Sequence, residues 1–153
     1  MLIILSGIES QRKQLEELLI EKFQNSTKTI VLVQGLVEDN QKESIVKGIK
    51  VYNYLLSDAL EKEINQSEVI VCRSGYSSIM DLAVLHKKAF FIPTKNQSEQ
   101  EYLAQHLQSE KIAPFSTAKE FTIDHLNTVD KYKGLKIENT ILNKDLLGLF
   151  QGK

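Results

Sequence analysis

Short apolar runs alternate with helical periods along this chain, and this alternation constrains its fold more than any other feature. Runs that are hydrophobic at consecutive positions predict strands buried on both faces of a sheet. Such runs occur at Leu2–Leu5, Thr29–Val33, Ile49–Tyr52, Val69–Cys72, Ala89–Ile92 and Ile112–Phe115. Because amphipathic helices separate most of them, we predict an α/β domain with a Rossmann-like, doubly wound parallel sheet.

The helices are predicted from apolar residues spaced three and four apart. The first lies in the region of Leu15–Phe23, and the second begins near Ser57 and ends at Ile64. The others are Tyr76–His86, Ser98–Ser109, Thr117–Asn127 and Ile141–Phe150. The polar residues 36–48 are predicted to form a loop. No repeat or proline-rich linker divides the chain, so residues 1–153 are predicted to be one domain.

Composition and charge exclude several classes of protein. The chain has 19 basic and 20 acidic residues, a balance that does not indicate a nucleic-acid-binding face. Cys72 is the single cysteine, which excludes an internal disulfide and a multi-cysteine metal site, and suits a reducing compartment. No apolar run approaches the roughly 20 residues that span a bilayer. We therefore expect a cytoplasmic protein.

Open α/β sheets bind ligands outside the carboxyl ends of their strands. Here that edge carries the loops Ser6–Gln11, Tyr54–Asp58, Arg73–Ser78 and Thr94–Glu101. The first loop reads Ser6-Gly7-Ile8-Glu9 and departs from the G-x-G-x-x-G pattern of dinucleotide sites. We therefore expect no dinucleotide there, and no cofactor is predicted.

The third loop joins a buried strand to a helix through Ser74-Gly75. Gly75 allows a close backbone approach or a positive φ angle, and the first turn of a helix attracts anions such as phosphate. Ser77 and Ser78 follow, and Asp81 lies about one turn further, where its carboxylate suits the hydroxyls of a ribose. The alternative is purely structural: Ser74 caps the helix and Asp81 complements its dipole.

The fourth loop places amides and carboxylates where the hydroxyls of a sugar would be recognised. Gln97 and Gln100 each carry a side chain that both donates and accepts hydrogen bonds. Glu101 is a further candidate ligand. The alternative is a capping box in which Ser98 and Glu101 close the start of the next helix. The histidines, at positions 86, 106 and 125, lack a metal-ligand spacing, so no metal site is predicted.

The segment VIVCRSGYSSIMDLAVLHKKAFFIPTKNQSEQEYLA, residues 69–104, resembles the C-terminal domain of family 28 glycosyltransferases. The best-known member of that family adds N-acetylglucosamine to the lipid-linked peptidoglycan precursor. The matching features are Cys72–Gly75, Asp81, Phe91–Pro93 and Gln97–Tyr102. The resemblance extends by element order from Met1 to about Phe115.

The resemblance implies one half of a GT-B architecture, the half that binds a UDP-sugar such as UDP-N-acetylglucosamine. By position, Asp81 would hold the ribose, and the backbone of Tyr76, Ser77 and Ser78 would line the diphosphate. Gln97, Gln100 and Glu101 would reach the sugar or the phosphates. The loop at Ser57 would face the uracil, and Ser6 would keep one phosphate contact. Enzymes of this kind transfer the sugar without a bound metal.

Two departures from the family limit what this chain is expected to do. The first loop lacks the family's GGS-like glycines, and Glu9 would repel a phosphate if it pointed inward. An acceptor-binding half is also absent from the 153 residues. We expect that half in an N-terminal domain or a separate subunit, which would also supply any contact with the inner face of the membrane. The chain alone is not expected to catalyse transfer, and no catalytic residue is assigned.

Two other functions remain open from the sequence. One is a domain like that of UDP-N-acetylglucosamine 2-epimerases, which would form an epimer without any acceptor. The other is a flavodoxin-like interaction module without catalysis, which would associate stably but bind no nucleotide.

Overall fold

One mostly parallel sheet forms the centre of the structure, a computed structural model that describes residues 1–140. Within these residues it has six strands in the order β3-β4-β2-β1-β5-β6. Their bounds are β1 Leu2–Ile4, β2 Val31–Val33, β3 Glu43–Val46, β4 Ile49–Tyr52, β5 Ile70–Cys72 and β6 Ala89–Phe91. All neighbouring strands are parallel except β3 and β4.

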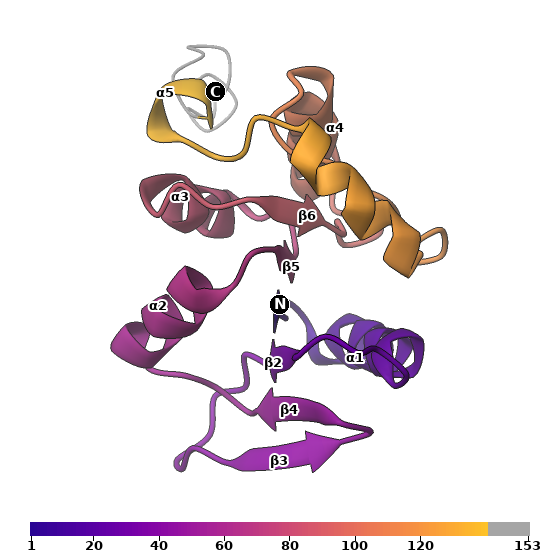
Figure 1. Cartoon of the computed structure of the whole chain (residues 1–153), viewed down its shortest axis with the longest axis vertical. Coiled ribbons are helices and arrows are strands. Elements are labelled where there is room, and N and C mark those ends of the chain that lie inside the picture. Colours follow the sequence, from indigo (N-terminus) through magenta and orange to yellow (C-terminus); the bar gives the residue numbers. More distant parts are fainter. Residues whose placement is uncertain (141–153) are drawn as a thin grey trace.

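Helices cover both faces of the sheet, which confirms the predicted doubly wound α/β fold (Figure 1). Their bounds are α1 Glu9–Phe23, α2 Ser57–Gln66, α3 Tyr76–Val84, α4 Ser98–Ser109, a 3₁₀ helix η1 Ile123–Lys131, and α5 Ile137–Thr140. In the view of Figure 1, α2 and α3 lie on the left of the sheet and α1 lies on the right. The predicted helices near Leu15–Phe23, from Ser57 and at Ser98–Ser109 are confirmed, and α3 ends two residues before His86.

The strands are apolar at consecutive positions because each contributes to two cores. Ile3 pairs with Val71, which pairs with Phe90, and all three side chains join the cluster that includes Leu15 and Leu19 of α1. Their neighbours along the strands point the other way. Leu2, Ile70, Cys72, Ala89 and Phe91 join the cluster that includes residues of α2, α3 and α4. Burial on both faces therefore accounts for the pattern read from the sequence.

The topology reverses between β1 and β5. From β1 the chain builds outward through β2 to β4, and it then returns to the other side of β1 to add β5 and β6. The connections that leave β1 and β5 therefore diverge toward opposite faces of the sheet. In doubly wound folds, ligands bind in the crevice at this switch point. In this chain, the loop that begins at Arg73 lies on one side of that crevice.

The loop predicted for residues 36–48 is wrong in part, because it contains strand β3. Lys47 and Gly48 both have positive φ angles, 49° and 80°, as a two-residue hairpin of type I′ requires. This turn pairs β3 with β4 in an antiparallel register, Val46 opposite Ile49. All four residues of β3 are exposed, so the strand has no buried apolar pattern by which it could be recognised.

Two predictions for residues beyond α4 are also wrong. Ile112–Phe115 does not form a strand, and only an isolated bridge joins Phe115 to Phe91. The helix predicted at Thr117–Asn127 is replaced by η1, because the backbone N–H of Thr122 donates to His125 Nδ1 and their capping box starts a new helix at residue 123. The predicted helix Ile141–Phe150 lies outside the described residues.

Candidate functional site

Arg73 holds three segments together at the carboxyl edge of the sheet. Its Nη1 donates to the carbonyl oxygens of Ile92 and Pro93, both at 3.1 Å. Its Nη2 donates to the carbonyl oxygen of Gln11, 3.2 Å away in the first turns of α1. The side chain is buried, and burial lowers the pKa of its guanidinium. The first, third and fourth loops are thus brought together by one cation at the switch point.

Ser74 joins the third loop to the fourth. It is fully buried, and its hydroxyl donates to the carbonyl oxygen of Gln100 at 2.7 Å. The alternative reading of Ser74 as the cap of α3 is wrong, because the N-cap residue is Gly75 and no side chain caps this helix. The hydroxyl of Ser74 is therefore used to fix the position of α4 against the start of α3.

The start of α3 suits an anion better than the other helix starts do. Its first hydrogen bond runs from Ile79 N to Gly75 O, so the N–H groups of Ser77 and Ser78 precede the helical ladder. No acidic residue lies in its first turn, whereas every other helix described in residues 1–140 has one there. The partial positive charge of α3 is therefore not offset locally.

Gly75 leaves open space at this helix start. Its φ is −72°, so the reading that a positive φ requires glycine here is wrong. A Cβ built on Gly75 would meet nothing within 4 Å. Neither the backbone nor the packing therefore demands glycine at this position, and close approach of a ligand to the backbone stays a prediction.

Ser77 and Asp81 lie on one exposed face of α3, because they are four residues apart in the helix. The carboxylate of Asp81 makes no hydrogen bond or ion pair with any residue of the described chain. It is therefore available to accept hydrogen bonds from a ligand that reaches across the first turn of α3. Tyr76 and Ser78 are half-buried beside them.

The fourth loop is held by its own side chains. Gln100 Oε1 accepts a hydrogen bond from Thr94 N at 2.9 Å, and Gln100 Nε2 donates to Gln97 Oε1 at 2.6 Å. Glu101 Oε1 accepts from Asn96 N at 3.0 Å. The predicted capping box of Ser98 and Glu101 is wrong, because the N-cap is Gln97 and no side chain caps α4. Gln97, Gln100 and Glu101 are half-buried, so each retains some exposed surface.

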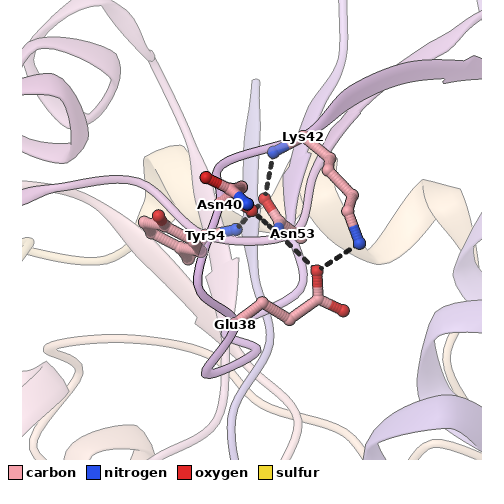
Figure 2. Close-up of polar contacts among 5 residues, drawn as sticks. All are labelled: Glu38, Asn40, Lys42, Asn53 and Tyr54. Carbon is pink, nitrogen blue, oxygen red and sulfur yellow. Dashed lines mark hydrogen bonds and ion pairs between the residues drawn. The ribbon is translucent and has the colours of Figure 1, made fainter.

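The second loop begins at a buried amide that the sequence analysis missed. Figure 2 shows Asn53 at the centre of four hydrogen bonds. Its Oδ1 accepts from the backbone N–H groups of Lys42 and Tyr54, at 2.7 and 2.9 Å. Its Nδ2 donates to Glu38 Oε2 and to the carbonyl oxygen of Asn40, at 2.8 and 2.9 Å. A polar residue directly after an apolar strand was the available signal.

This network sets where the chain leaves β4 toward α2. Lys42 Nζ contacts the same Glu38 oxygen at 2.9 Å, so residues 38–42 and Asn53 at the end of β4 are tied to one point. Ser57 is exposed as the first residue of α2, whose N-cap is Leu56. Ser6 is exposed at the end of β1.

Cys72 ends β5 and is fully shielded. Burial raises the pKa of its thiol to about 12. Because the thiolate is the reactive species, we expect Cys72 to react with a disulfide reagent at pH 8 about 1,000-fold more slowly in the folded chain than in urea. Absorbance of the released thiol measures both rates. Equal rates in the two states would contradict the burial of this residue.

Residues 1–140 lack two further features, a metal-binding cluster and a membrane span. No group of three His, Cys, Asp or Glu side chains in this part of the chain could hold a metal ion. None of its helices is long and apolar enough to cross a bilayer.

Comparisons with known proteins identify both a family and a fold. The glycosyltransferase family 28 C-terminal domain matches residues 2–135. A search of curated proteins found no match. Among solved structures, the glycotransferase of kitacinnamycin superimposes with a TM-score of 0.63 at 19% identity, over 85% of this chain and 34% of its own.

Two further structures give a similar result. The glycosyltransferase SnogD from Streptomyces nogalater has a TM-score of 0.62 at 12% identity, over 84% of this chain and 33% of its own. The spinosyn forosaminyltransferase SpnP has a TM-score of 0.60 at 14% identity, over 95% of this chain and 37% of its own. The chain thus spans about a third of the length of each of these three proteins. At such low identity, the likeness shows the fold.

Proposed function

Because the chain belongs to the glycosyltransferase family 28 C-terminal domain family and has the fold of one half of a GT-B enzyme, we propose that it binds the sugar donor of a glycosyltransferase. The proposed donor is a UDP-sugar, specifically UDP-N-acetylglucosamine. The whole enzyme would transfer a hexosamine to a lipid- or glycan-linked acceptor. A second half, in an N-terminal domain or a separate subunit, would bind that acceptor.

The observation that carries this proposal is the start of α3. It follows β5 at the switch point, has no acid in its first turn, and leaves open space over Gly75. A diphosphate placed there accepts hydrogen bonds from successive backbone N–H groups of Tyr76, Ser77 and Ser78. The exposed carboxylate of Asp81 then lies one turn along the helix, where it accepts hydrogen bonds from the ribose hydroxyls.

The neighbouring loops complete the proposed donor site. Ser57 and the backbone beside it face the uracil, and Asn53 acts as a positioning residue because its hydrogen bonds fix the start of that loop. Gln97, Gln100 and Glu101 approach the sugar or the phosphates. Ser74 supports this loop, because its buried hydroxyl donates a hydrogen bond to the carbonyl oxygen of Gln100. Ser6 provides one further contact from the end of β1.

In this site the protein would assist the reaction electrostatically. When the bond between sugar and diphosphate breaks, negative charge develops on the leaving UDP. The N–H groups and dipole of α3 stabilise that charge without reorganising, and the proposal requires no metal ion. Positioning of the acceptor and removal of its proton belong to the second half, so the chain alone is expected to bind the donor without transferring the sugar.

Titration of the 153-residue chain with UDP, followed by amide NMR, tests this function. We expect shifts at residues 75–81, and we expect Asp81→Ala to weaken UDP binding by about 10- to 100-fold, because hydrogen bonds to a charged group contribute about 1.5–3 kcal/mol. The same variant should bind 2′,3′-dideoxy-UDP as the unchanged chain does. Asp124→Ala, at an exposed acid of η1, is the matched control.

Two results would contradict the proposal. Absence of shifts at residues 75–81 in millimolar UDP would exclude the diphosphate site. Equal losses of affinity for UDP and its dideoxy analogue in Asp81→Ala would exclude the ribose role of this carboxylate.

A further inference from the structure

A second recess lies beside the proposed donor site. It is an open pocket of about 710 Å³, bounded by α1, the end of β6, α4 and residues 115–119. This volume is within the range of small-molecule sites. Of the residues proposed to bind the donor, only Glu101 also lines this pocket. The pocket therefore adjoins the proposed donor site but is lined almost entirely by other residues.

One part of the wall is apolar. Leu18 of α1, Phe115 and Ala118 are partly exposed in this wall, and Leu15 and Pro93, which are buried, also line it. A ligand that covers the three partly exposed side chains gains roughly 25 cal/mol for each Å² of apolar surface removed from water. This part of the pocket therefore favours a ligand with an aliphatic or aromatic body.

The charged part of the wall is mainly basic. Arg73, Lys95 and Lys119 line the pocket together with one carboxylate, that of Glu101. Lys95 and Lys119 are exposed, and neither ammonium group forms a hydrogen bond or ion pair with residues 1–140. Glu101 already accepts a hydrogen bond from the backbone of Asn96. The local charge therefore favours an anion.

Arg73 adds a buried cation to this wall. Its side chain is only 4% exposed, and its Nε has no hydrogen-bond partner in the described chain. Its two Nη groups bind backbone carbonyls, so no carboxylate neutralises the guanidinium. Buried charges are normally paired, because desolvating a lone charge is costly. An anion in the pocket would supply the missing counter-charge.

We propose that this pocket binds an anionic amphiphile, a molecule with an apolar body and a phosphate or carboxylate group. The apolar body covers Leu18, Phe115 and Ala118, and the anionic group lies toward Arg73, Lys95 and Lys119. The binding does not depend on the donor function proposed above. Its occupant would be distinct from UDP, which has no comparable apolar part.

Three probes separate the parts of this proposal in amide NMR titrations of the full chain. Octyl phosphate has both the apolar body and the anion, octanol has only the first, and inorganic phosphate has only the second. We expect octyl phosphate to shift the amides of Gln14, Leu18 and Thr117, with an affinity at least about ten times that for either other probe. Each titration stays below the concentration at which octyl phosphate aggregates.

Charge reversal provides the matched variants. Lys119→Glu should weaken the binding of octyl phosphate at least about tenfold and leave UDP binding unchanged. Lys62→Glu, at an exposed lysine of α2, should change neither affinity. If octanol bound as tightly as octyl phosphate, the anion preference would be overturned. If inorganic phosphate bound as tightly as octyl phosphate, the pocket would hold an adventitious ion only. Shifts scattered outside the pocket would also overturn the proposal. Because UDP is titrated into the same samples, failure of this site is distinguishable from failure of the donor site.

Discussion

Replacing Gly75 by valine is expected to weaken UDP binding about 100-fold or more while the chain stays folded. A side chain at this position would enter the space over the start of α3, where nothing lies within 4 Å of the added Cβ. It would keep the diphosphate away from the N–H groups of Ser77 and Ser78. Two charge-assisted hydrogen bonds, each of about 1.5–3 kcal/mol, would be lost. Isothermal titration calorimetry with UDP measures the effect.

Two controls make this prediction specific. The backbone of Gly75 has a φ of −72° and a ψ of 146°, which valine adopts without strain, so urea denaturation should show a loss of about 1 kcal/mol or less. Uridine lacks the diphosphate, and its binding should change much less than that of UDP. A variant that binds UDP as tightly as the unchanged chain would refute the placement of the diphosphate at α3.

The second large effect concerns stability. Phe121→Ala should lower the free energy of unfolding by about 3–5 kcal/mol, because the removed ring leaves a cavity in the core beneath α1. Phe121 is fully buried, with ring centroids 5.4 Å from Phe90 and 6.1 Å from Phe23. A domain of this size has a total stability of about 5–15 kcal/mol, so the loss would be a large share of it. Urea titration followed by circular dichroism measures it.

Ile123 is the matched control for Phe121. It lies two residues away, at the start of η1, and is 41% exposed. Ile123→Ala should therefore cost less than about 1 kcal/mol. Equal losses of unfolding free energy in the two variants would show that residues 117–131 do not pack on the sheet as they do in the structure.

The central strands were predictable because burial on both faces makes every residue of a strand apolar. Ile3, Val71 and Phe90 serve one core, and Leu2 and Ile70 serve the other, so the runs stand out from the helices between them. Strand β3 has no such signal, since its register depends on a turn at Lys47-Gly48 and on an exposed edge. The capping box at Thr122 similarly replaced a helix that apolar spacing alone had predicted.

The candidate site was likewise predictable from the sequence only in part. The helix start at Gly75 and the exposed Asp81 follow from local spacing, and the structure places them on α3 as expected. The contacts of Arg73 and Asn53 were not predicted, because both side chains bind groups that are distant in sequence, including backbone carbonyls. Any residue has a carbonyl, so such partners leave no pattern in the sequence. The positions where UDP and the sugar would contact these loops stay predictions.

The hairpin at one end of the sheet has a consequence for solubility. Without β3, the outermost strand would be β4, with its buried Ile49, Val51 and Tyr52 beside an unpaired row of backbone groups. Such an edge is a template for strand addition between molecules, the first step of aggregation. The strand that replaces it is only four residues long and begins with Glu43, whose carboxylate pairs with Lys50. A border this short, with a carboxylate at its start, gives other chains little length on which to extend the sheet.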